Sequence, residues 1–416
     1  MDAQISSNVA AILHVQEIVA LDRFRNIDPI PFALLRKKLG IIVTRILCES
    51  PHILSSEDLF LAGASLMILE SEGNYSKGEL LCVFRSNYRE LLELEEHNFV
   101  KIAPLGSDYL VSIHDNENEE TNEDSITFCI WNWRGGNMLL DWNLSPMSSS
   151  SVDVLVALDN ERILIGDSDG IISLLDVAHE EIVFRSDTGF SGGVAALVAL
   201  KDGHVAVSGK MSDTDAADLA IIDISTGLRV MTLEGSVGTI WAIAQLKDGR
   251  LASAGRDTIV RLWDIKPLPV ATRRSTNQLD RCTRRLFGHR VFVSALVQLG
   301  SDKLLSGDGY GYIRMWDLRE GFSGDVQPED AHPVWEIHAH KTRIRSLHVL
   351  ADNATLISCA VDNRTIRIWD AYTGQHVKML VGMAAAGGVR QLVLLSDGVT
   401  LASISHSEAP IKLWGF

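Results

Sequence analysis

Three histidines lie close together in the segment AHPVWEIHAH, and imidazole groups are common ligands of zinc. If the segment is an extended strand, alternation places His338 and His340 on one face, with His332 upstream of them. No cysteine or carboxylate stands at a convincing spacing to complete a zinc site. The acidic run Asp115 to Asp124, DNENEETNED, lacks the spaced oxygen ligands and the glycine of a calcium-binding loop. We therefore expect no metal ion and no cofactor.

Several catalytic motifs are also missing from the sequence. It contains no HExxH motif and no P-loop, and no Gly-rich segment joins a strand to a helix as a phosphate cradle requires. The cysteines are dispersed, odd in number and without a CxxC pair, which is typical of free thiols in a reducing compartment. They are Cys48, Cys82, Cys129, Cys282 and Cys359. These features predict that the protein is not an enzyme.

The elements that must position any site form a repeat. The stretch LASAGRDTIVRLWDI, Leu251 to Ile265, has alternating apolar residues on both sides of a Gly-Arg-Asp turn, which is typical of a β-hairpin. Similar stretches occur further along the chain, and weaker copies precede it. Aligned on the last strand, their anchors fall at residues 131, 175, 222, 263, 316, 369 and 414. A period of about 40 to 45 residues is that of a four-stranded propeller blade.

The rest of each unit supplies two more strands. A buried strand that ends in a turn precedes each hairpin, as in VAALVALKDG from Val194. A fourth strand follows each anchor, as in GLRVMTLEG from Gly227. Four short strands per unit with little helix predict an all-β fold built as a radial array of sheets.

On these motifs the chain resembles the WD40-repeat family over residues 79–416. The resemblance implies a β-propeller of seven blades, with eight as the alternative, and a hydrogen-bonded tetrad of side chains in each well-formed blade. The residues that match the tetrad are His340, Ser358, Asp362 and Trp369 in one unit, Ser253, Asp257 and Trp263 in another, and His289, Ser306 and Trp316 in a third. In the third unit Tyr310 stands at the position of the turn aspartate, so we expect Asp308 to lie outside the tetrad.

Residues 1–78 do not follow the repeat. Ser6 and Ser7 are suited to cap a helix through VAAILHVQEIVAL, so we expect a partly helical N-terminal extension. The segments IIVTRIL, DLFLAG and SLMILES are alternatives for strands of a degenerate extra blade. A seven-bladed ring needs one N-terminal strand to complete the blade that ends at Trp414, and either ELLCVFRSN or RELLELEEH could supply it.

Composition limits the environment and the partners. The net charge of -16 argues against general affinity for nucleic acid or acidic lipid. No apolar run reaches the length of a membrane span, and MDAQISSNVA lacks the basic and apolar regions of a secretory signal. We expect a cytoplasmic protein that is monomeric alone and acts within a complex, with a nuclear location left open.

In the WD40 family, the start of each innermost strand reaches the mouth of the central channel, where ligands commonly dock. The corresponding residues here are Lys101, Asp153, Ala195, Trp241, Ser294, Arg345 and Arg390, and the rim adds Arg256, Phe292, Tyr310 and Arg343. With seven blades, Arg345, Arg390 and Lys101 lie on consecutive blades. Clustered positive charge beside aromatic rings suits a short acidic or phosphorylated peptide.

Two functions follow from this interpretation. The first is a non-enzymatic scaffold that binds partner proteins or short peptides through the propeller surface. The second is a substrate-recognition subunit of a cullin-type ubiquitin ligase. WDLR at Trp316 to Arg319 resembles the WDxR element of such receptors, and IPFALL with SSEDLFLAGAS resembles an F-box.

Overall fold

The computed structural model describes residues 89–97, 99–117, 124–144, 151–211, 215–266, 281–319, 332–361, 365–381, 388–405 and 409–415. All regular secondary structure in these ranges is β-strand. The predicted extension 1–78, the alternative strands within it and Asp362 lie outside the described residues. The chain divides into two compact units, and the larger comprises Leu92–Ser396 and Leu401–Lys412. In the smaller unit, the Asp397 carboxylate accepts hydrogen bonds from the backbone N–H groups of Val399 and Thr400.

The described residues form seven four-stranded sheets, here called blades 1 to 7. From the innermost strand outward, blade 1 contains β2 (Phe99–Leu105), β3 (Tyr109–Glu117), β4 (Asp124–Asn132) and β5 (Asn137–Leu144). Blade 2 contains β6 (Val152–Ala157), β7 (Arg162–Asp167), β8 (Ile171–Asp176) and β9 (Glu181–Asp187). Blade 3 contains β10 (Val194–Ala199), β11 (His204–Gly209), β12 (Ala216–Asp223) and β13 (Arg229–Val237). Blade 4 contains β14 (Ile240–Gln245), β15 (Leu251–Gly255), β16 (Val260–Trp263) and β17 (Cys282–Leu286).

The remaining blades follow the same order. Blade 5 contains β18 (Val293–Leu299), β19 (Lys303–Asp308), β20 (Tyr312–Asp317) and β21 (Trp335–His338). Blade 6 contains β22 (Ile344–Val349), β23 (Thr355–Ala360), β24 (Thr365–Asp370) and β25 (His376–Val381). Blade 7 contains β26 (Val389–Leu394), β27 (Leu401–Ser405), β28 (Ala409–Gly415) and β1 (Arg89–His97).

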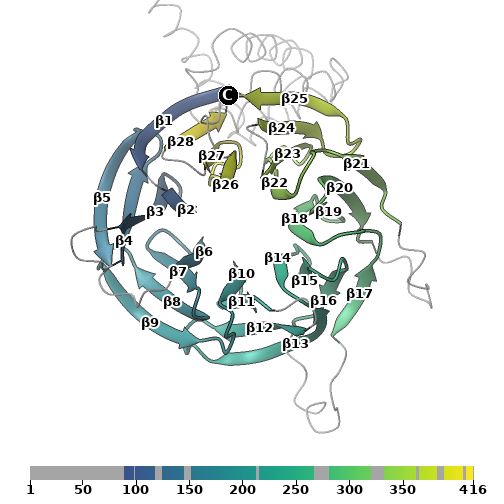
Figure 1. Ribbon diagram of the computed structural model, residues 1–416, viewed down its shortest axis with the longest axis horizontal. Helices are drawn as coiled ribbons and strands as arrows, with labels where there is room; N and C mark the ends of the chain where they lie inside the picture. The colour runs from purple at the N-terminus through teal and green to yellow at the C-terminus, as the bar shows by residue number, and fades with distance from the viewer. Residues whose placement is uncertain are drawn as a thin grey trace, which may run out of the picture. The chain divides into compact units, whose positions relative to one another are not determined.

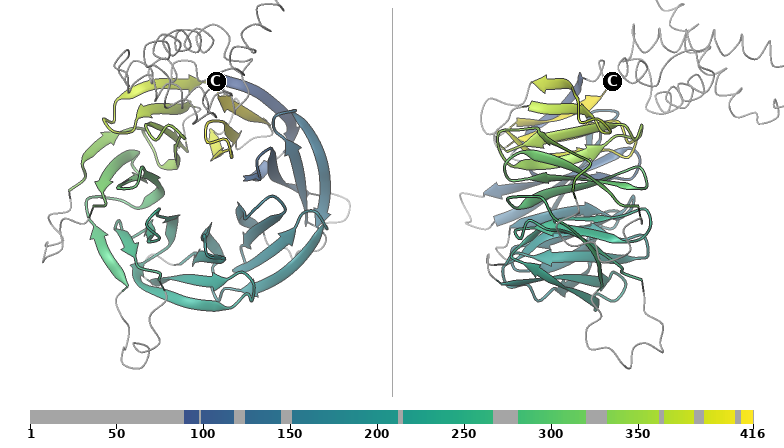
Figure 2. Two further views of the ribbon diagram at one scale, coloured as in Figure 1. Left: turned by 180° about the vertical axis from the view of Figure 1, so that it is seen from behind. Right: turned by 90° about the vertical axis from the view of Figure 1, so that its right-hand side faces the viewer.

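The innermost strands close into a ring. Strands β2, β6, β10, β14, β18, β22 and β26 contact one another in this order, and β26 contacts β2 (Figure 1). The Gln391 side chain of β26 bonds both backbone groups of Ile102 in β2, at 3.0 Å to the N–H and 2.8 Å to the carbonyl. Figure 2 shows the blades from behind and from the side. The expectation of seven blades is confirmed, and the closing strand is RELLELEEH, since β1 pairs with β28.

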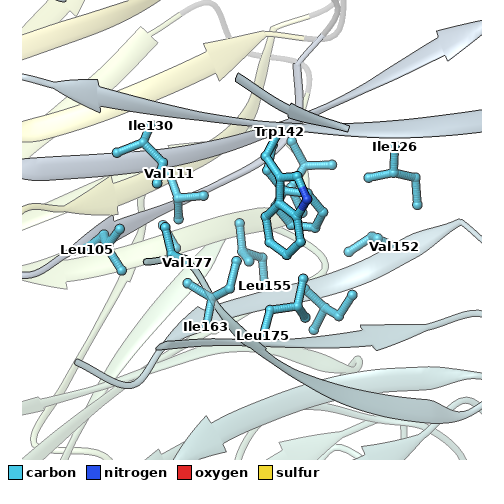
Figure 3. Packing of buried hydrophobic residues seen from close by; sticks show 14 residues of the cluster. Leu105, Val111, Ile126, Ile130, Trp142, Val152, Leu155, Ile163, Leu175 and Val177 are labelled. Atoms are coloured by element: carbon cyan, nitrogen blue, oxygen red, sulfur yellow. The ribbon is translucent and has the colours of Figure 1, made fainter. Parts of the chain in front are cut away.

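The apolar core lies between consecutive blades. Each middle strand is covered on both faces, so all five residues of β15 are buried. Outer strands such as β9 face solvent along most of their length. Between blades 1 and 2, residues of both sheets interdigitate around Trp142, Leu155 and Ile163 (Figure 3). Stability is therefore shared between neighbouring blades.

On one face of the ring, the start of each innermost strand lies beside the C-terminal part of the second strand of its blade. Val293 at the start of β18 pairs with Asp308 at the end of β19, so the turn after β19 lies beside the entrance to the innermost strand. Gly311 in that turn has a φ of 82°, and a Cβ there would lie 2.0 Å from the His340 carbonyl oxygen. Only glycine fits, and the turn stays packed against the loop that leads into β22. We call this face the channel mouth.

Candidate functional site

A β-bulge opens each innermost strand at the channel mouth. The register shift leaves one unpaired residue near the start of each strand, which redirects its side chain. In six strands these residues are Asp153, Ala195, Trp241, Ser294, Arg345 and Arg390. In β2 the unpaired residue is Val100, because Phe99 pairs with His114 and Lys101 with Ile113. The predicted alignment is therefore wrong by one residue in this strand.

Lys101 nevertheless acts electrostatically on the same cluster. Burial and the charge of Arg345 lower the pKa of Lys101 to about 8; Asp153 opposes this shift and Arg390 adds to it. Asp153 offers little compensation, because its carboxylate lies 2.6 Å from the Lys210 ammonium. The Arg345 Nε donates to the Arg390 carbonyl at 2.8 Å, which fixes its guanidinium at the seam of blades 6 and 7. We call Lys101, Arg345 and Arg390 the basic arc.

Beside the basic arc lies an aromatic platform made of Trp241 and Phe292. Their rings meet edge to face with centroids 4.6 Å apart, across blades 4 and 5. The Arg343 guanidinium of blade 6 lies 5.1 Å from the Trp241 ring and 5.4 Å from the Phe292 ring. Burial and the charge of Arg345 lower the pKa of Arg343, and its buried Nε has no hydrogen-bond partner among the described residues. Three consecutive blades thus hold one guanidinium in place.

Other rim residues surround these groups. Tyr310 is 61% exposed, and its backbone N–H donates to Asp308. Arg256 is exposed directly after β15, and its N–H donates to the Thr239 carbonyl. Lys210 occupies the same position after β11, where its N–H donates to the Gly193 carbonyl. The sequence prediction omitted Lys210, although its place directly after a second strand was a usable signal.

The residues that match the tetrads are hydrogen-bonded within their own blades, and Asp257 also bonds to the preceding blade. In blade 6 the Ser358 hydroxyl lies 2.7 Å from His340 Nε2 and accepts from the Trp369 indole at 2.8 Å. In blade 4 the Trp263 indole donates to Ser253 at 2.7 Å. Asp257 accepts the Val237 N–H at 3.1 Å and forms an ion pair with Arg261. A similar pair that the sequence prediction did not include joins Trp131 to Ser112 in blade 1 at 2.8 Å.

Blade 5 contradicts the expectation for Asp308. This residue is 1% exposed, and its Oδ2 lies 3.0 Å from His289 Nδ1 and 2.7 Å from Arg314 Nη1. His289 Nε2 lies 2.6 Å from the Ser306 hydroxyl, which accepts from the Trp316 indole at 2.8 Å. The carboxylate therefore comes from the end of β19, two residues before Tyr310, and does the work that Asp257 does from the turn in blade 4.

The remaining candidate residues are the three histidines, Arg319 and the F-box-like segments. His340 is buried, whereas His332 and His338 are exposed, and the His338 ring stacks 4.6 Å from Tyr312. In the ranges that the structure describes, no three His, Cys, Asp or Glu side chains are grouped to hold a metal ion. Arg319 is exposed and pairs with Asp317 and Asp302. The F-box-like segments lie outside the described residues.

One further motif forms a loop. The pattern G-x-S-x-G occurs at Gly189 to Gly193, but it forms the loop from β9 to β10, whereas a nucleophile elbow joins a strand to a helix. The Gly193 N–H closes this loop on the Phe190 carbonyl at 3.1 Å. No helix in the described part of the chain is long and apolar enough to cross a membrane.

Comparisons with known proteins agree with this architecture. The family model for the WD domain, G-beta repeat, matches residues 227–264 and 331–370. The chain is 26% identical over 159 residues to mitochondrial division protein 1 of Eremothecium gossypii, which is 38% of this chain and 20% of that protein. It is 27% identical over 290 residues to nuclear distribution protein PAC1 of Arthroderma otae, which is 62% of this chain and 58% of that protein. The chain therefore spans less than two thirds of either relative.

A solved structure shows the same fold. The crystal structure of the WD40 β-propeller domain of Doa1 has a TM-score of 0.59 at 16% identity, covering 79% of this chain and 96% of that one. At this level of identity the likeness concerns the fold alone.

Proposed function

Because the chain belongs to the WD40-repeat β-propeller family, we propose that it is a non-enzymatic scaffold that binds a short anionic segment of a partner protein at the channel mouth. The anionic segment is acidic or phosphorylated. Both curated relatives are named for a cellular process, mitochondrial division and nuclear distribution, and neither name denotes a reaction. The propeller fold supports a role in assembling proteins. The positive side chains at the channel mouth support a partner segment of negative charge.

One observation carries the proposal: at the channel mouth of this acidic protein, Lys101 and Arg343 both lie close enough to Arg345 for its positive charge to lower their pKa values. No described carboxylate acts on the charge of Arg343 or Arg345, and the one that acts on Lys101 is bonded to Lys210. Like charges that are partly desolvated repel one another, so an anion that binds between them gains charge-assisted hydrogen bonds and relieves the repulsion. Trp241 and Phe292 add apolar contact area of the kind found at interface hot spots.

The test is a pull-down from cell extract with the wild type and the double variant Arg345→Glu, Arg390→Glu. Loss of two hydrogen bonds to a charged partner costs about 1.5–3 kcal/mol each, so captured partners should fall at least about a hundredfold. Raising salt from about 0.15 M to 1 M shortens the Debye length from about 8 Å to 3 Å and should weaken capture by the wild type.

The matched control is Lys201→Glu, Lys247→Glu. Both lysines are exposed in the turns that follow β10 and β14, at the opposite end of the innermost strands. This control carries the same charge change and should retain the partners. An unchanged set of partners on the Arg345, Arg390 variant, with equal melting temperatures, would move the binding site to the side surface or the N-terminal extension.

We further propose that the protein acts in the cytoplasm as a monomeric subunit of a larger complex. The expected absence of nucleic-acid binding rests on the net charge of -16, and the basic arc is too local to alter it. The ubiquitin-ligase alternative remains a prediction from Trp316 to Arg319 and from the N-terminal segments.

A further inference from the structure

Arg343 differs from the other cations of the channel mouth because its guanidinium is held by aromatic rings. It precedes β22, and Arg345 follows one residue after the buried Ile344. Arg343 directly precedes β22 and Arg345 is the unpaired residue of its β-bulge, so both arginines lie at the end of this strand that reaches the channel mouth. Arg343 reaches across the neighbouring blade to Phe292 and on to Trp241, two blades away. Contacts on two rings restrict the rotation of its long side chain.

Arg345 is fixed in a different way. Its Nε donates to the Arg390 carbonyl at 2.8 Å, so its orientation is set by the backbone of blade 7. The two guanidiniums are close enough for the charge of Arg345 to lower the pKa of Arg343. Neither has a described carboxylate that acts on its charge. The mouth therefore presents two oriented, uncompensated guanidiniums next to each other.

We propose that Arg343 and Arg345 form a subsite for the phosphate of a phosphorylated serine or threonine, and that Trp241 and Phe292 are positioning residues for Arg343. This inference rests on the proposed function and narrows its anionic segment to a phosphorylated one. A phosphate monoester carries a charge of about -1.5 to -2 and three acceptor oxygens, so it can engage two guanidinium forks at once. A carboxylate has two oxygens and a single charge, so one fork satisfies it and the second guanidinium stays uncompensated.

The aromatic platform explains why arginine is needed at position 343. A guanidinium is planar, stacks on rings and presents a fixed fork of donors, whereas an ammonium is a strongly hydrated point charge on a flexible stem. Restricting the guanidinium before binding removes part of the entropy cost of ordering it. Lysine at this position would keep the charge but lose both the stacking geometry and the fork.

The experiment uses the full chain and an array of random peptides with phosphoserine, phosphothreonine or glutamate fixed at the centre. The strongest phosphopeptide and its glutamate counterpart are then compared by fluorescence anisotropy. We expect the wild type to prefer the phosphopeptide by about tenfold or more, the size of one additional charge-assisted hydrogen bond. In Arg343→Lys and Trp241→Leu the ratio of the affinity for the phosphopeptide to that for the glutamate peptide should fall close to one, whatever the loss of affinity that the two peptides share.

The outcomes separate this inference from the function on which it rests. If peptides bind and depend on Arg345 and Arg390, but phosphoserine and glutamate bind equally, the phosphate subsite is refuted while the proposed function stands. A preference that persists in Arg343→Lys also refutes it. If no peptide binds in a manner sensitive to charge reversal of Arg345 and Arg390, both are refuted. Melting curves identify any loss that comes from unfolding of the Trp241→Leu variant, and Arg343→Lys then decides the question.

Discussion

Replacing Asp308 by alanine tests whether the buried network of blade 5 has been read correctly. The carboxylate accepts the backbone N–H groups of Tyr310 and Tyr312, both at 3.0 Å, and contacts His289 and Arg314. Each buried donor left without a partner costs about 1–3 kcal/mol, and breaking a buried ion pair costs about 3–5 kcal/mol. Arg314 keeps its ion pair with Glu336, which limits the loss. We expect Asp308→Ala to lower the free energy of unfolding by about 3–5 kcal/mol.

The assay is urea denaturation followed by tryptophan fluorescence, with Asp169→Ala as the control. Asp169 is an exposed turn aspartate of blade 2, so its loss should change stability by less than about 0.5 kcal/mol. Asp308→Asn keeps an acceptor oxygen and should fall between the wild type and Asp308→Ala, which provides a measurable step if the alanine variant fails to fold. Equal midpoints for the alanine variants at 308 and 169 would refute the network as described.

Three further predictions concern ring closure, pH and the alternative function. Deleting residues 401–416 removes β27 and β28, leaves β26 and β1 unpaired, and should abolish the cooperative thermal transition, so a retained melting temperature would count against the closure. Burial lowers the pKa of His289 despite its bond to Asp308, so at this site the folded protein binds fewer protons than the unfolded chain does. The free energy of unfolding should therefore fall as the pH drops below about 6.5. His289→Gln should reduce this pH dependence in urea titrations. Arg319→Ala should leave the melting temperature unchanged, because this side chain is exposed, and loss of a co-purifying cullin adaptor from this variant would favour the ligase hypothesis.

Much of the fold could be predicted because propeller blades repeat locally in the sequence. Alternating apolar residues around a turn and an anchor every 41 to 53 residues mark each hairpin without any long-range information. The strand that closes the seventh blade could not be chosen in this way, because it pairs with a segment far away in the sequence. RELLELEEH and ELLCVFRSN are both acceptable strands, and the pairing of β1 with β28 selects the first.

The error at Asp308 arose from aligning turns by spacing alone. Tyr310 does stand where Asp257 stands in blade 4, but a carboxylate two residues earlier reaches the same buried donors from the end of the strand. Blade 2 repeats this arrangement, because Asp167 ends β7 and accepts the N–H groups of Asp169 and Ile171. The dipeptide Gly-Asp at the end of both strands was the available signal. The hydrogen-bond donors around a position, more than its place in the repeat, therefore decide whether an aspartate is buried there.

At the channel mouth, the repeat period predicts which blade holds each residue but not which side chains are in contact. Arg345 and Arg390 were placed on neighbouring blades by counting repeats, and the hydrogen bond from the Arg345 Nε to the Arg390 carbonyl agrees with that placement. The contact of Arg343 with Trp241 could not be counted in this way, because it joins side chains two blades apart and depends on the curvature of the ring. The long side chain of Arg343 extends past the neighbouring blade, where it contacts Phe292. The Phe292 ring in turn packs against Trp241. The length of the Arg343 side chain and the curvature of the ring together therefore determine that its guanidinium is held against two aromatic rings, and a guanidinium held in one orientation is best suited to select a partner.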